Sequence, residues 1–178
     1  MKKEFLFSFA GKPSKLIIQE ELPSLESVAR DMGGDFAAFL AVCDEHTLPF
    51  AEEITRGRAP VCVLPPGEEA KTWNSVQRIL AAARESGIGR DGLIAGIGGG
   101  VVTDLAGFAA SVYMRGTGLC FVSTTLLGMV DAATGGKTGF DLFGVKNLAG
   151  TFYPAALVYL PVRSLRTLPP AEWKSGMA

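Results

Sequence analysis

The feature that most constrains the fold of this chain is a regular alternation of apolar runs with segments of helical spacing. The runs at residues 36–43, 59–64 and 92–97 contain no charged side chain. Such continuous apolar runs are typical of strands that are covered on both faces, as in parallel sheets. Between them, residues 48–55 and 73–85 repeat apolar side chains at the spacing of an amphipathic helix.

The same alternation continues before and after this central part. We expect further strands at residues 15–20, 119–122 and 155–160, and further helices at 22–32, 101–114, 125–132 and 170–178. Because strands and helices alternate with short connections, the sequence predicts an α/β fold, a Rossmann-like parallel sheet with helices on both faces. In such a sheet a ligand is expected beyond the carboxyl ends of the strands.

Length and composition restrict the class of protein. The 178 residues suffice for one domain with its own core. Seventeen Lys and Arg face eighteen Asp and Glu without a basic run, so nucleic acid is not an expected partner. Residues 92–112 are nearly uncharged, but six glycines and Asp104 favour a strand and a helix over a membrane span. The three cysteines lie in apolar runs, which predicts buried free thiols and a cytoplasmic location.

A triple glycine, Gly98-Gly99-Gly100, stands where a strand is expected to end and a helix to begin. Glycines there allow a phosphate to approach the backbone, and the helix start offers free amides. Val101 departs from the G-x-G-x-x-G fingerprint, and a tight structural turn is the alternative interpretation. Asp104, one turn further on, needs a partner if it is buried. It either complements the helix dipole or binds a ribose hydroxyl.

Two other segments carry polar residues after expected strands. Pro66-Gly67 predicts a turn that leads to a helix cap at Thr72. The densest segment contains Thr124, Thr125, Asp131, Lys137, Lys146 and Asn147. Its four glycines predict a glycine-rich loop after the helix at 125–132. Together with nearby Arg115, its lysines and asparagine suit a multiply charged anion such as a sugar phosphate, and solvated surface lysines are the alternative.

Several linked runs resemble the 3-dehydroquinate synthase family. They are GGGVVTDLAGFAASVYMRG, STTLLGMVDAATGGKTGFDLFGVKNLAGTFYPAALVYL and LRTLPPAEWKSGMA, with PPGEEAK upstream. The resemblance spans about residues 44–178. It implies the amino-terminal domain of the dehydroquinate synthase-like fold.

The resemblance also implies roles for matching positions. NAD would contact Asp44, Glu68, Lys71, Gly99, Gly100, Val101, Asp104, Thr124, Thr125, Lys137, Lys146, Ser164, Leu165, Arg166 and Thr167. Asp131, Lys137 and Asn147 would hold the substrate, 3-deoxy-arabino-heptulosonate 7-phosphate. Arg115 would reach its phosphate from the neighbouring subunit of a homodimer. This sequence departs from the family at His46, where asparagine is frequent, and at Val145, where glycine is commoner.

The activity that the resemblance implies is that of a carbon–oxygen lyase of the shikimate pathway. It would release phosphate and form 3-dehydroquinate with NAD that is recycled in each turnover. Zinc or another divalent cation would assist the hydride step. Its first ligand would be a glutamate directly after Ala178, and His46 is the only histidine here. We therefore expect residues 1–178 to be an NAD-binding domain, without its carboxy-terminal metal-binding helical domain and inactive alone.

Three alternatives remain open at this point. The chain could belong to another sugar-phosphate cyclase that acts on a heptulose or hexose phosphate. It could belong to a metal-dependent glycerol or alcohol dehydrogenase, although the GGKTG…KN segment speaks against this. It could also be a non-catalytic nucleotide-binding module.

Overall fold

The computed structural model describes residues 2–9, 11–34 and 36–177, so both ends of the expected domain, residues 1 and 178, lie outside the described residues. Within this part, the chain forms a seven-stranded sheet of order β1-β2-β9-β6-β5-β3-β4 and a separate pair, β7-β8. The strands are β1 (Lys2–Phe9), β2 (Lys12–Gln19), β3 (Phe39–Asp44), β4 (Val61–Leu64), β5 (Leu93–Gly98), β6 (Gly118–Ser123), β7 (Lys137–Leu142), β8 (Val145–Phe152) and β9 (Leu157–Pro161). The α-helices are α1 (Leu25–Met32), α2 (Leu48–Thr55), α3 (Trp73–Glu85), α4 (Gly100–Val112) and α5 (Pro170–Met177).

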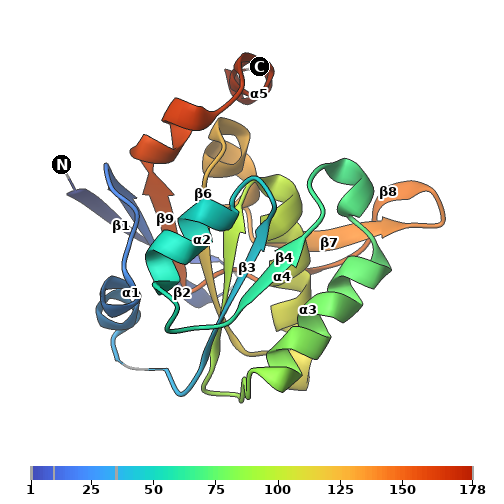
Figure 1. Cartoon of the computed structure of the whole chain (residues 1–178), viewed down its shortest axis with the longest axis horizontal. Helices are drawn as coiled ribbons and strands as arrows, with labels where there is room; N and C mark the ends of the chain where they lie inside the picture. Colours follow the sequence, from blue (N-terminus) through green and yellow to red (C-terminus); the bar gives the residue numbers. More distant parts are fainter. Residues whose placement is uncertain (1, 10, 35, 178) are drawn as a thin grey trace.

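The predicted parallel sheet is confirmed. Strands β2, β9, β6, β5, β3 and β4 run parallel, and only the edge strand β1 pairs antiparallel, with β2. Along β3, Leu40 and Val42 pack in the cluster that contains α3 and α4, whereas Ala41 and Cys43 pack in the cluster of α1 and α2. Successive side chains of a strand point to opposite faces, so both faces of this strand are buried. Figure 1 shows the two pairs of helices on the two sides of the sheet.

Local signals set most of the helix limits as predicted. Helices α2 and α3 have the bounds that their apolar spacing predicts. Thr72 caps α3, because its side chain accepts a hydrogen bond from the Ser75 amide. The last expected helix is confirmed to Met177, and its expected end at Ala178 lies outside the described residues.

The glycine-rich loop, predicted to follow the helix at 125–132 and to reach Asn147, is wrong from residue 137 onward. These residues belong to the antiparallel β7–β8 hairpin, which extends from one side of the molecule in Figure 1. Gly139 and Gly150 are cross-strand partners, and a Cβ on Gly139 would lie 2.6 Å from the Ala149 carbonyl oxygen. The glycines therefore allow a close approach of two strands, a role that their low strand propensity conceals in the sequence.

Two other elements also differ from expectation. Strand β1 was not expected; its alternation is weak because both of its faces are largely exposed. The helix expected at 125–132 is largely a π-helix, Gly128–Ala132. Within this turn Gly128 lies against β6, since a Cβ there would be 2.6 Å from Ser123 Oγ. A π-helical turn widens the path of the chain and often occurs at functional sites.

The cysteines are buried free thiols, as predicted, and burial raises the pKa of each one. They therefore behave as small apolar side chains. Across the described part of the chain, no helix has both the length and the apolar character that a membrane crossing requires.

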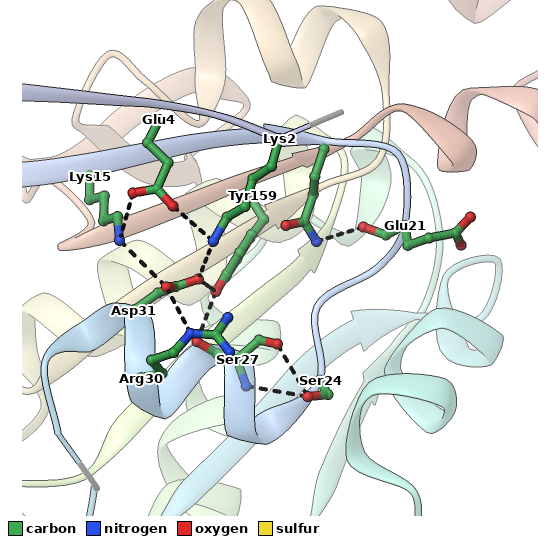
Figure 2. Close-up of polar contacts among 10 residues, drawn as sticks. Lys2, Glu4, Lys15, Glu21, Ser24, Ser27, Arg30, Asp31 and Tyr159 are labelled. Carbon is green, nitrogen blue, oxygen red and sulfur yellow. Dashed lines mark hydrogen bonds and ion pairs between the residues drawn. The ribbon is translucent and has the colours of Figure 1, made fainter.

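A buried carboxylate, Asp31, joins the edge of the sheet to α1 (Figure 2). Its side chain is 5% exposed, and Lys2 of β1 and Lys15 of β2 lie 3.3 and 3.4 Å from its oxygens. Tyr159 of β9 is fully buried and donates a hydrogen bond of 2.7 Å to Asp31 Oδ2. Burial opposes the ionisation of Asp31, but the hydrogen bonds from Tyr159 and Lys2 and the neighbouring cations lower its pKa to about 2.

Replacing Asp31 with asparagine should change how stability depends on pH. A carboxyl whose pKa falls on folding stabilises the fold above its unfolded pKa, and this contribution disappears as the pH drops toward 2. The shift corresponds to about 2 kcal/mol at pH 7. We expect Asp31→Asn to be less stable than the parent by about 1–3 kcal/mol at pH 7, and the difference to shrink by pH 2.5. Urea unfolding at several pH values measures this, with Glu85→Gln as an exposed control; a constant difference would contradict it.

Candidate functional site

The carboxyl ends of the parallel strands surround one large cavity of about 860 Å³. Asp44 ends β3, Gly67 follows β4, Gly99 follows β5 and Thr124 follows β6, and all four line it. Ser164, in the turn after β9, completes this edge. The sequence predicted a ligand site at this edge, and the structure provides a cavity of suitable position.

The start of α4 forms one wall of the larger cavity. Gly99 is the N-cap, and Gly100, Val101 and Val102 of the first turn line the cavity. The first amides of a helix have no partner within the helix, so this wall favours negatively charged groups. Gly99 also has to be small, because a Cβ there would lie 2.9 Å from Thr125 Cγ2. The structural interpretation of the triple glycine therefore holds, and its role toward a phosphate stays a prediction.

A cluster of charged and polar groups, formed by Lys71, Asp104 and Asn147 and called the Lys71 cluster below, lies beside this wall. Asp104, one turn into α4, has its Oδ2 atom 2.5 Å from Lys71 Nζ. Lys71 is 5% exposed and also donates to Asn147 Oδ1 at 2.5 Å. The three residues come from the short turn before α3, from α4 and from β8. The expectation that a buried Asp104 needs a partner is met by Lys71.

The electrostatics of Asp104 reflect competing influences. Burial raises its pKa, Lys71 opposes this rise, and the negative charges of Glu68 and Asp131 add to it. A carboxyl group with this environment retains its proton to higher pH than an exposed aspartate does. Carboxyl groups with a raised pKa in a cavity occur at functional sites, and ion-pair clusters also shift pKa values.

A second cavity of about 460 Å³ adjoins the first. Its walls are the β7–β8 hairpin, α4 and the π-helix, and Lys137, Thr138, Thr151 and Phe152 line it on the hairpin side. Both cavities are lined by Asp104, Asp131, Ala132 and Asn147. The two spaces therefore meet at the Lys71 cluster.

The structure brings most of the residues singled out in the sequence to these two cavities. The larger one is lined by Asp44, Glu68, Lys71, Gly99, Gly100, Val101, Asp104, Thr124, Thr125, Asp131, Asn147, Ser164 and Thr167. Lys137 lines the smaller one. Lys146 is 72% exposed and lies at the rim, 3.2 Å from Glu68.

Besides Lys146 at the rim, three of the singled-out residues line neither cavity. Leu165 is buried in the core, and Arg166 pairs with Glu20 at 2.7 Å. Arg115 follows the carboxyl end of α4, roughly 20 Å along the helix from the cavity wall. Its side chain therefore does not join Lys137 and Asn147 within this chain. Its role toward a neighbouring subunit stays a prediction.

Several cavity residues were not singled out from the sequence. Phe50, Leu127, Leu168 and Pro169 add apolar surface, and Thr138 and Thr151 add hydroxyl groups. Thr138 and Thr151 share a hydrogen bond of 2.7 Å across the hairpin. The sequence does not reveal that Thr138 and Thr151 lie together, because this depends on the register of the hairpin. Phe50 and Leu168 look like ordinary core residues in the sequence, and only their position beside the strand ends distinguishes them.

Comparisons with known proteins agree on the family. The protein-family model described as 3-dehydroquinate synthase N-terminal matches residues 61–175 of this chain. The 3-dehydroquinate synthase of Pyrococcus abyssi (strain GE5 / Orsay) is 48% identical over 126 residues, which cover 71% of this chain and 38% of that protein. The 3-dehydroquinate synthase of Thermococcus kodakarensis (strain ATCC BAA-918 / JCM 12380 / KOD1) is 43% identical over 158 residues, with 88% and 46% covered.

Solved structures show the same architecture. 2-Deoxy-scyllo-inosose synthase, complexed with carbaglucose-6-phosphate, NAD+ and Co2+, superposes with a TM-score of 0.84 at 31% identity. The match covers 98% of this chain and 50% of that one. A probable glycerol dehydrogenase from Sinorhizobium meliloti 1021, at 16% identity and a TM-score of 0.64, shares the fold alone. The chain spans less than half the length of the two curated relatives above, and it belongs to the 3-dehydroquinate synthase family, whose amino-terminal domain it matches.

Proposed function

We propose that this chain is the nucleotide-binding part of a 3-dehydroquinate synthase and that the 860 Å³ cavity holds NAD. The observation that carries the proposal is the shared cavity at the strand ends. The free amides of α4, the Asp104 carboxylate and the Thr124-Thr125 pair all line this one space. Family membership supports the same assignment.

The chemistry of the cavity wall suits a dinucleotide. The amino terminus of α4 would receive the pyrophosphate, as helix starts do in other nucleotide sites. Asp44 and Asp104 would accept hydrogen bonds from ribose hydroxyls, and Phe50 and Leu127 offer apolar surface to a flat ring. Glu68, Lys71, Lys146 and the turn at 164–167 would complete the contacts. When bound, NAD supplies the hydride acceptor that oxidises a secondary alcohol.

The smaller cavity is proposed to hold the sugar-phosphate substrate. Lys137 supplies a cation there, while Asp131 and Asn147 can bind hydroxyl groups. We infer that the whole protein converts 3-deoxy-arabino-heptulosonate 7-phosphate to 3-dehydroquinate and phosphate. Arg115 of a neighbouring subunit would then reach the phosphate in a homodimer. In this scheme the residues of this chain orient the two ligands beside each other.

We infer that the catalytic metal is held outside these residues. Among the described residues, no group of three or more His, Cys, Asp or Glu could hold a metal ion. Co2+ and Zn2+ appear in the names of two solved relatives, 2-deoxy-scyllo-inosose synthase and 2-epi-5-epi-valiolone synthase. The ligands would belong to the part of the relatives' length that this chain does not span.

A second candidate is another sugar-phosphate cyclase. The 31% identity to 2-deoxy-scyllo-inosose synthase over nearly the whole chain favours this class. The 48% and 43% identities to curated 3-dehydroquinate synthases favour the first candidate. Assaying the full-length protein for phosphate release with the heptulosonate phosphate and with a hexose phosphate separates the two.

Changing Asp104 to asparagine should weaken NAD binding while preserving the fold. The amide retains the shape of the side chain and can accept a hydrogen bond from Lys71, but it loses the charge that receives ribose hydroxyls. We expect the dissociation constant for NAD+ to rise about 10- to 100-fold in calorimetric titration. Glu85→Gln, on exposed α3 surface, is the matched control. Equal heats for Asp104→Asn and the parent would contradict the assignment of this cavity.

Adding one methyl group at Gly100 should weaken NAD+ binding without lowering the stability of the fold. A Cβ there would meet only Ala132, at 3.6 Å, so the fold can accept it. The methyl group would nevertheless occupy space against the α4 amides that are proposed to hold the pyrophosphate. We expect Gly100→Ala to bind NAD+ at least about tenfold more weakly, with nearly the parental melting temperature. Gly34→Ala, where a Cβ meets nothing within 4 Å, should leave both quantities unchanged.

A further inference from the structure

The junction between the two cavities is organised by one buried ammonium group. Lys71 Nζ lies 2.5 Å from Asp104 Oδ2 and 2.5 Å from Asn147 Oδ1. Asp104 and Asn147 each line both cavities. An ammonium group has three donors and no acceptor, so whatever faces it has to present a lone pair.

Backbone bonds hold the same junction in place. The Asp141 amide donates to the Lys71 carbonyl oxygen at 2.8 Å, and Asp141 Oδ1 accepts the Asn147 amide at 2.7 Å. Asn147 has a φ of 53°, a left-handed conformation that asparagine tolerates better than most residues. The hairpin end is thus tied to Lys71 through Asp141 and directly through the side chain of Asn147.

The orientation of the Asn147 amide follows from this arrangement. If the amide were turned over, its NH2 group would face the Lys71 ammonium, and donor would oppose donor. With Oδ1 bound to Lys71, the NH2 group remains for a ligand. A ligand atom that binds this NH2 group would then have to be an acceptor, such as a hydroxyl, carboxylate or phosphate oxygen.

We propose that Lys71 is a positioning residue that fixes the polarity of Asn147, so that the junction of the two cavities presents hydrogen-bond donors to an oxygen-rich ligand. The proposal deepens the function proposed above, in which a sugar phosphate occupies the smaller cavity beside NAD. It adds a role for Lys71 that does not require contact with either ligand. Its first consequence is visible in the free protein, so its test does not depend on NAD binding.

The first measurement follows the Asn147 side-chain NH2 signals in 1H–15N spectra of the free chain, assigned by their loss in Asn147→Asp. We expect Lys71→Met to move these signals toward those of asparagines whose side chains make no hydrogen bond within the protein, and to speed their exchange with water about tenfold. Lys174→Met removes an exposed lysine of α5 and should leave them unchanged. A folded Lys71→Met protein with unaltered Asn147 signals would overturn the proposal.

The reciprocal measurement follows the 15N signal of the Lys71 ammonium and keeps the proposal testable if Lys71→Met does not fold. Asn147 is exposed, so its variants should fold. Asn147→Asp keeps an acceptor toward Lys71 and should keep a slowly exchanging ammonium signal, whereas Asn147→Leu should shift it and speed its exchange. An ammonium signal that is the same in all three proteins would refute the positioning role. Failure of NAD+ to bind any of them would instead refute the proposed function alone.

Discussion

The parallel direction of the central strands is the constraint on which the rest of this structure depends. Because the strands run the same way, the residues after β3, β4, β5, β6 and β9 meet at one edge. A parallel sheet needs helices on both faces, and these helices also begin at that edge. Free helix amides, carboxylates and hydroxyl groups are thereby collected around one cavity, although they are far apart in the sequence.

The buried ammonium group of Lys71 connects this cavity to the β7–β8 hairpin, which lies outside the main sheet. Lys71 and Asp104 are costly to bury singly and are stabilised as a pair, which requires the turn before α3 to lie against α4. Asn147 extends the cluster to the β7–β8 hairpin, and Gly139 and Gly150 let the hairpin strands approach closely. The second cavity exists because this hairpin is held against α4 and the π-helix. The contacts that hold the hairpin therefore also shape the second cavity.

The match to 3-dehydroquinate synthases gains a physical basis from this arrangement. Solved relatives below 25% identity share the sheet and its helices, as the glycerol dehydrogenase does. The match to the 3-dehydroquinate synthase family model covers residues 61–175, which include Asp131, Lys137 and Asn147. The sheet accounts for nucleotide-type architecture in general, whereas the hairpin and its lysines carry the features that we connect with a sugar phosphate.

The sequence by itself determined the α/β class, most strand and helix positions and the placing of Asp44, Gly99 and Thr124 at strand ends. Apolar periodicity and capping residues such as Thr72 are local signals, so they can be detected without tertiary structure. Only the tertiary structure decided that residues 137–152 form a hairpin and that Lys71 is buried against Asp104 and Asn147. It also decided that Arg115 lies away from the two cavities. Strand pairing and charge pairing join residues that are distant in the chain, and the energy of such contacts leaves little trace in local sequence.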